Sequence, residues 1–271
     1  MANFSIISCL AQVGILPVGA TDRKAWYVLP SEGDAPVTVI FVNLNDGCWL
    51  NVREAHVGGS YKDLLQMLSP RVGIHCLGEV PHIECEWLYG CWPSSSKRED
   101  YVHILEVKEF TSTTINRVAA LGLSTSFARK YTVDITFANG QRRGLRAIGV
   151  ANIAGGYTAI HLGGKPRTLG PLGAALIPGD GNEPNTCLVT VGLEPFLRAE
   201  TSVYDTIIIP SHSSINKIDP FVGLYDRALL LSPNKSRQAL RSHLLQFDDV
   251  RLEDFYLPED WEGTLWGNYN G

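Results

Sequence analysis

The stretch YTVDITFANGQRRGLRAIGV, residues 131–150, decides the fold class that the sequence predicts. Asn139-Gly140 at its centre is a strong signal for a tight hairpin turn, and strand-forming residues flank it on both sides. Similar short runs of apolar and β-branched residues, separated by turn residues, recur along the chain, at 26–57, 100–110, 156–162, 173–177 and 187–193. This pattern is typical of short strands joined by tight turns, so we predict a mainly β protein.

A Ser/Thr-rich connection at 111–126 separates two β-rich blocks of similar length. We predict an N-terminal β-rich lobe at 1–115 and a second β-rich lobe at 120–231. The two lobes are expected to pack either as two barrels, in the chymotrypsin-like manner, or as a sandwich. A third segment, 232–271, is expected to contain a helix and an acidic, aromatic tail.

The late helix is predicted from its capping residues and its apolar stripe. Ser232 suits the N-cap and Pro233 suits the first helical position. Leu240, Leu244 and Phe247 then recur at a helical spacing on one face. A second, shorter helix is indicated by SYKDLLQML at residues 60–68, whose leucines also fall on one face.

Composition and charge describe an ordinary globular chain. It has 271 residues, a formal net charge of −5 and a mean hydropathy of zero, and it contains no apolar run of the roughly 20 residues that a membrane helix needs. Seven acidic residues and one basic residue lie in 248–271, so the rest of the chain is nearly neutral and lacks a general charge for binding nucleic acid. The six cysteines show no paired framework, and we expect reduced thiols in the cytoplasm.

Two candidate catalytic residues lie close together in LNDGCWLNVREAHVGG, residues 44–59. Cys48 is followed by a tryptophan, as a cysteine nucleophile can be, whereas His56 follows an apolar strand, as a general base can. The two hypotheses need different folds, because a thiolate nucleophile requires a helix N-terminus and the histidine requires a strand end.

The segment ending at His56 resembles the base region of viral chymotrypsin-like serine proteases. EDYVHILEV resembles the strand that follows the orienting carboxylate of that family, which implies this role for Asp100. The segment from Gly170 through AALI and LVTVGL resembles the nucleophile turn followed by a strand and its hairpin partner. However, Leu172 occupies the nucleophile position, so the resemblance implies a protease-like frame that acts without serine catalysis.

The segment DGCWLN resembles the nucleophile region of papain-like leader proteases of positive-strand RNA viruses. This resemblance implies Cys48 as the nucleophile and His161 as its partner histidine, with His103 as the alternative. Such enzymes release themselves at their own C-terminus, and the ending WGNYNG suits cleavage after glycine. Against this hypothesis, the residues after Cys48 are poor helix formers, and they favour a strand.

Two further clusters carry potential binding chemistry. Histidines and cysteines that could ligate zinc gather within residues 75–91, but their spacing matches no standard zinc finger, and we predict neither a metal nor a cofactor. Basic residues gather around the 131–150 hairpin and are predicted to bind RNA phosphates or the acidic tail; they are Arg129, Lys130, Arg142, Arg143 and Arg146. Alternatively, these basic residues form the solvated tip of the hairpin and bind nothing.

The sequence therefore favours a viral-type protein that is not a catalyst and acts by binding or assembly, with a protein partner or copies of itself and with RNA as a further possible partner. The enzyme alternative is the papain-like cysteine protease that uses Cys48 and His161. A β-rich subunit of a capsid is the third hypothesis, and it explains the composition without any motif.

Overall fold

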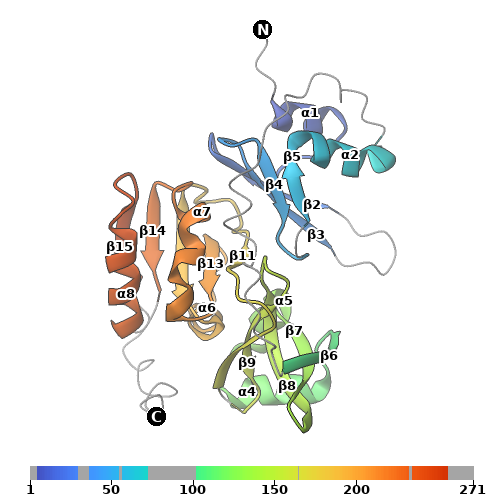
Figure 1. The fold of residues 1–271 in the computed structure, drawn as a ribbon, viewed down its shortest axis with the longest axis vertical. Coiled ribbons are helices and arrows are strands. Elements are labelled where there is room, and N and C mark those ends of the chain that lie inside the picture. Colours follow the sequence, from blue (N-terminus) through green and yellow to red (C-terminus); the bar gives the residue numbers. More distant parts are fainter. Residues whose placement is uncertain are drawn as a thin grey trace.

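A computed structural model gives the structure of the chain and describes residues 5–29, 37–54, 57–72, 102–163, 165–231 and 234–255. These residues form three five-stranded sheets, which we name sheets A, B and C in chain order. The prediction of a mainly β, multi-lobed protein is confirmed. Figure 1 shows sheet A at the top, sheet B at the lower right and sheet C at the left.

Sheet A is an antiparallel meander in which the strands keep their chain order. Its strands are β1 (Gly19–Ala20), β2 (Lys24–Leu29), β3 (Thr38–Asn43), β4 (Cys48–Asn51) and β5 (Gly58–Ser60). Helices α1 (Ile6–Gln12) and α2 (Tyr61–Val72) pack on one face of this sheet, over a core that includes Tyr27, Trp49 and Leu64. The predicted helix at 60–68 is therefore confirmed as the first part of α2.

Sheet B is a second antiparallel meander. Its strands are β6 (Val102–Lys108), β7 (Val133–Asn139), β8 (Arg142–Ala151), β9 (Tyr157–His161) and β10 (Lys165–Leu169). The predicted hairpin is confirmed as β7 and β8, where Asn139 pairs with Arg142 and Gly140 adopts a positive φ of 58°. Strand β6 pairs with β7, so residues on both sides of the 115–120 boundary belong to one sheet.

Sheet C differs in kind, because most of its strands are parallel. Its strands are β11 (Ala175–Ile177), β12 (Thr186–Val191), β13 (Asp205–Ile209), β14 (Arg227–Leu230) and β15 (Arg251–Asp254), and they lie side by side in the order β11-β13-β12-β14-β15. Only β11 runs antiparallel to its neighbour. The crossovers are α6 (Leu193–Ala199), the 3-10 helix η2 (His212–Ile218) with α7 (Asp219–Val222), and α8 (Asn234–Leu244).

Two details of the sequence analysis need correction, and a third, the late helix, is confirmed. The strands AALI and LVTVGL do not form a hairpin, because β13 lies between β11 and β12. The connection at 111–126 contains two helices, α4 (Ser112–Ala120) and α5 (Thr125–Tyr131), capped by the hydroxyls of Thr111 and Ser124. The predicted late helix is confirmed as α8, although it is one of several helices, and its expected cap at Ser232 and Pro233 lies outside the described residues.

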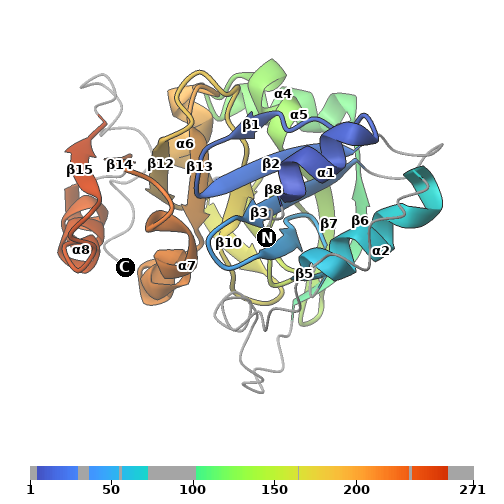
Figure 2. The same cartoon turned by 90° about the horizontal axis from the view of Figure 1, so that it is seen from above.

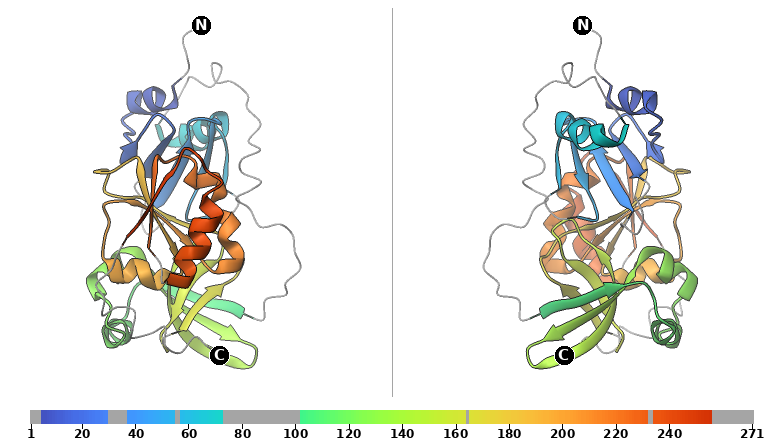
Figure 3. Two further views of the ribbon diagram at one scale, coloured as in Figure 1. Left: turned by 90° about the vertical axis from the view of Figure 1, so that its left-hand side faces the viewer. Right: turned by 90° about the vertical axis from the view of Figure 1, so that its right-hand side faces the viewer.

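Sheet C packs against both of the other sheets. One of its faces packs with helices α7 and α8 against the inner face of sheet A, through residues such as Val189, Phe41 and Phe221. The opposite face packs with α6 against α4, α5 and sheet B. Figure 2 shows α8 and β15 on the side of the molecule opposite α2, and Figure 3 shows α8 (red) lying along sheet C.

Sheet C contains a buried threonine hydroxyl that makes no hydrogen bond within the described residues. Thr190 on β12 is fully buried, and its Oγ1 has no hydrogen-bond partner within the described part of the chain. Thr114 on α4 is equally buried, but its hydroxyl donates to the Asp134 carboxylate. The two threonines therefore form a matched pair for substitution by valine, which has nearly the same shape.

We expect Thr190→Val to raise the free energy of unfolding by about 1 kcal/mol, because valine removes a buried polar group that has no partner. Thr114→Val should lower the same free energy by about 1–3 kcal/mol, because it leaves part of a buried carboxylate without a donor. Urea denaturation of both variants checks this prediction. A destabilised Thr190→Val variant would show that its hydroxyl has a partner.

Candidate functional site

A buried charge centre joins sheets A and C. Lys24, the first residue of β2, places its Nζ 2.5 Å from Oδ2 of Asp205, the first residue of β13. The same oxygen accepts hydrogen bonds from Trp26 Nε1 at 2.8 Å and from the Tyr225 hydroxyl at 2.9 Å, while Oδ1 accepts from the Gly179 amide at 2.8 Å. The Lys24 side chain is only 1% exposed.

The groups of this buried charge centre are engaged with one another and serve a structural role. The four donors just described are all directed at the Asp205 carboxylate, and the Lys24 ammonium also lies 4.3 Å from the centroid of the Tyr225 ring. Burial, followed by the negative charge of Asp205, raises the pKa of both Cys187 and Tyr225. Cys187 therefore stays a thiol and Tyr225 a phenol, and the centre serves to join the two sheets.

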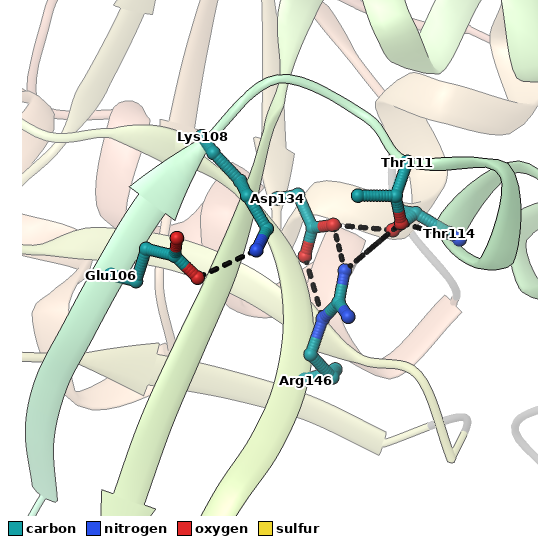
Figure 4. A network of polar contacts seen from close by, with 6 residues as sticks. All are labelled: Glu106, Lys108, Thr111, Thr114, Asp134 and Arg146. Carbon is teal, nitrogen blue, oxygen red and sulfur yellow. Dashed lines mark hydrogen bonds and ion pairs between the residues drawn. The ribbon is translucent and has the colours of Figure 1, made fainter.

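A second polar network fixes helix α4 onto sheet B (Figure 4). Asp134 on β7 is fully buried, and both of its oxygens accept from the guanidinium of Arg146 on β8, through Nε at 3.0 Å and through Nη2. The Thr114 hydroxyl donates to the same carboxylate, and Arg146 Nη2 donates to Thr114 Oγ1 at 2.8 Å and to Thr111 Oγ1 at 3.3 Å. Arg146 therefore has a structural role.

The basic residues predicted to gather around the 131–150 hairpin have different surroundings in the structure. Arg146 is directed at Asp134, so its guanidinium is engaged within sheet B, and a role for it in binding phosphates or the acidic tail stays a prediction. Arg129 lies 3.9 Å from the Glu109 carboxylate, and the Lys130 ammonium lies 4.9 Å from the centroid of the Tyr131 ring. The exposed side chains of Arg142 and Arg143 remain at the hairpin tip, and the acidic tail beyond residue 255 lies outside the described residues.

The residues proposed for the chymotrypsin-like frame are only partly described. His56 and Asp100 lie outside the described residues, as do the candidate zinc ligands at 75–91. Leu172 is half-buried in the connection between β10 and β11, next to Pro171, whose carbonyl accepts from Asn152 Nδ2 at 2.9 Å. The roles assigned to His56 and Asp100 therefore stay predictions. Such a frame consists of antiparallel barrels, whereas most strand pairs of sheet C are parallel.

The residues of the papain-like hypothesis occupy two different sheets. Cys48 is the fully buried first residue of β4 in sheet A, where the chain forms a strand and not a helix N-terminus, and its sulfur is held in a disulfide. His161 is the last residue of β9 in sheet B, and its Nδ1 accepts from the Gly163 amide at 3.0 Å. The expectation of reduced thiols is wrong for Cys48, and nucleophilic attack by this residue would first require reduction of its disulfide.

A different site follows from the strand order of sheet C. The crossover from β12 leads through α6 to β13 on one side, whereas the crossover from β14 leads through α8 to β15 on the other side. Helices α6 and α8 contact opposite faces of the sheet. In open parallel sheets the carboxyl edge beside such a reversal is the usual place for a ligand, because the two connecting loops separate there.

Hydroxyl groups and one imidazole gather at this carboxyl edge. Ser211 and His212 directly follow β13, and the Ser211 hydroxyl lies 2.9 Å from that of Ser213 and 3.1 Å from that of Ser214. His212 Nε2 lies 2.6 Å from the hydroxyl of Ser236, which sits in the first turn of α8. We define Ser211, His212, Ser213, Ser214 and Ser236 as the carboxyl-edge cluster.

The sequence analysis missed this cluster. The segment TIIIPSHSS at 206–214 changes from an apolar run to small polar residues within two positions, and this is the change expected at the carboxyl end of a buried parallel strand. Comparison of the chain with protein-family models, with curated proteins and with solved structures finds no match. Among the helices in the described ranges, none is both long and apolar enough to cross a membrane.

Proposed function

We propose that this protein acts by binding, and that it holds a phosphate-bearing or similar anionic ligand at the carboxyl-edge cluster of sheet C. The observation that carries this proposal is the position of the cluster at the carboxyl edge of sheet C, where the segment after β13 meets the first turn of α8, the helix that follows β14. A binding function was also expected from the sequence, but the residues of this cluster were not among the predicted site residues.

The chemistry of the cluster supports an anionic ligand. Hydroxyl groups donate hydrogen bonds to phosphate oxygens, and the amides in the first turn of a helix such as α8 have no acceptors within the helix. His212 is exposed, and an imidazole N–H can donate a hydrogen bond to an anion. Ser214 and Ser236 are both 3% exposed, so their positions are fixed by packing and are ordered before any ligand arrives.

The test is a titration of the full chain with inorganic phosphate and with adenosine monophosphate, followed by NMR chemical shifts and by calorimetry. We expect shifts confined to residues 210–214 and to the first turn of α8. The double variant Ser211→Ala/His212→Ala should weaken binding at least about tenfold, because each lost hydrogen bond to a charged group is worth about 1.5–3 kcal/mol.

Ser126→Ala is the matched control, since Ser126 is an exposed serine on α5 whose hydroxyl bonds only to Ser124 in the described structure. This variant should bind like the unchanged protein. Shifts spread over the whole surface, or equal binding by the double variant, would remove the carboxyl edge as the ligand site. RNA, expected as a possible partner from the sequence, would bind in this proposal through its phosphates at the same edge.

A further inference from the structure

Two histidines make their polar contacts at α8, and the two contacts differ. His243, near the end of α8, has its Nε2 2.6 Å from the Asp219 carboxylate, which is a common structural link between an imidazole and an acid. His212, directly after β13, has its Nε2 2.6 Å from the Ser236 hydroxyl, and its ring makes no other polar contact within the described residues. An imidazole beside an aliphatic hydroxyl is the arrangement of a general base and a nucleophile.

The Ser236 hydroxyl is held in place beside this ring. Ser236 is 3% exposed, whereas His212 is exposed, so the hydrogen bond joins a packed side chain to one at the surface. The other hydroxyls of the carboxyl-edge cluster bond to one another, because Ser211 contacts both Ser213 and Ser214. Among the serines of this cluster, Ser236 is therefore the one placed to give its proton to an imidazole.

The backbone at Ser236 supplies a donor for negative charge. Ser236 is the third residue of α8, so its amide lies in the first turn, where N–H groups have no acceptor within the helix. When a serine oxygen attacks a carbonyl, negative charge develops on the carbonyl oxygen, and backbone amides such as that of the attacking residue stabilise this charge. A hydroxyl, a base and one such amide therefore occur within the same cluster.

We propose that Ser236 is a nucleophile, that His212 is its general base, and that the chain cleaves carboxylic esters at the carboxyl edge of sheet C. This inference rests on the proposed function, because the same edge must receive a ligand, and it adds that the ligand carries an ester. No carboxylate contacts the His212 ring within the described residues, so the proposed catalytic unit is a pair and not a triad.

The reaction has two steps, and water is the second reactant. In the first step, Ser236 Oγ bonds to the ester carbonyl carbon and its proton passes to His212 Nε2. The bond from this carbon to the alcohol oxygen then breaks, and the alcohol takes up the proton. In the second step, water gives a proton to His212 Nε2 and attacks the acyl group. Ser236 Oγ leaves with that proton, so the products are the alcohol and the carboxylic acid.

Labelling of the full chain with a fluorophosphonate, followed by mass spectrometry of its peptides, tests the nucleophile. The reactive serine oxygen displaces fluoride from phosphorus, so the labelled peptide identifies the residue. We expect the label on Ser236 and not on Ser126, the exposed serine of α5. A chain that stays unlabelled, or a label spread equally over exposed serines, would overturn the proposal.

The rate of this labelling tests the base. His212→Ala should slow the labelling of Ser236 at least about a hundredfold, because general base catalysis contributes about 10²–10⁴-fold. The matched control is His243→Ala, which removes the other histidine contact of α8 and should leave the rate unchanged. Circular dichroism checks that both variants keep their fold. Equal rates in His212→Ala and the unchanged protein would leave the hydrogen bond with a structural role alone.

A cysteine at the same position tests reactivity without an ester. The thiol of Ser236→Cys should be alkylated by iodoacetamide at least about tenfold faster than that of Ser236→Cys/His212→Ala, because a neighbouring histidine favours the thiolate. Equal alkylation of the two variants would contradict the assignment of His212 as the base.

Hydrolysis of 4-nitrophenyl acetate measures the complete reaction, and Ser236→Ala should lower its rate at least about a hundredfold. Equal hydrolysis by this variant and the unchanged protein would exclude Ser236 as the nucleophile. Phosphate binding by a chain that takes no label would remove the nucleophile and keep the binding site. A label on Ser236 in a chain that binds no phosphate would remove the anion site and keep the nucleophile.

Discussion

Asp205→Ala should lower the free energy of unfolding by about 3–5 kcal/mol, the largest loss that we expect from a single substitution in this chain. The variant leaves the buried Lys24 ammonium without its counterion, and it removes the acceptor of Trp26 Nε1 and of the Tyr225 hydroxyl. Guanidinium denaturation followed by fluorescence measures the loss, because Trp26 itself lies in the centre.

A neighbouring ion pair supplies the control. Arg23 and Asp226 directly adjoin Lys24 and Tyr225 in sequence and link the same two regions, but their side chains are 31% and 50% exposed. Asp226→Ala should therefore cost no more than about 1 kcal/mol. Equal losses in the Asp205 and Asp226 variants would contradict the view that burial makes the Asp205 contact strong.

The double variant Lys24→Met/Asp205→Leu separates charge from hydrogen bonding. Replacing a buried ion pair by apolar residues is often neutral. Here we expect the double variant to remain less stable than the unchanged protein, because the Trp26, Tyr225 and Gly179 donors still lack their acceptor. Full recovery of stability would show that these three hydrogen bonds contribute little.

Asp134→Ala is expected to produce the second largest effect, a loss of about 3 kcal/mol. The substitution leaves the half-buried Arg146 guanidinium without its counterion. It also removes the carboxylate that accepts the hydrogen bond of the Thr114 hydroxyl. Because Thr111 and Thr114 lie at the start of α4, hydrogen exchange should accelerate in that helix more than in β12 or β13.

The control for Asp134 lies in the same region of sheet B. Glu106 and Lys108 form an ion pair on β6 with side chains 53% and 36% exposed, and Figure 4 shows this pair beside the buried network. Glu106→Ala should change stability by less than about 1 kcal/mol and leave the exchange of α4 unaltered. If α4 stayed protected in Asp134→Ala, the network could not be what holds the helix.

The antiparallel strands could be predicted because their signals are local. Asn139-Gly140 specifies its turn through a positive φ at Gly140, and the residues on either side pair within one hairpin. Helix α8 was predictable for the same reason, since Leu240 and Leu244 are spaced along one face and both are fully buried.

Helices α4 and α5 were missed because the serine and threonine residues that cap them were interpreted as a loop. The hydroxyl residues at 111–126 suggested a loop, whereas Thr111 accepts from the Thr114 amide and Ser124 from the Phe127 amide at the two helix starts. Serine and threonine favour both loops and N-caps. Only the residues that follow distinguish the two cases, and both helices are short.

The parallel sheet could not be predicted from short apolar runs. TCLVTV and DTIII are buried on both faces, and such runs are compatible with either strand direction. Their direction is set by the helices between them and by contacts with sheets A and B, which are distant in sequence. The carboxyl-edge cluster depends on this direction, because antiparallel strands would have placed Ser211 away from Ser236.

The Lys24–Asp205 contact has a consequence for synthesis on the ribosome. The two residues are 181 positions apart, so at about 5–20 residues per second the lysine emerges roughly 10–40 s before its partner. During this interval the inner face of sheet A, with Trp26 and Phe41, has no sheet C to cover it. The nascent chain must therefore be shielded from aggregation until β12 and β13 have been translated, and a truncation before β12 should yield insoluble protein.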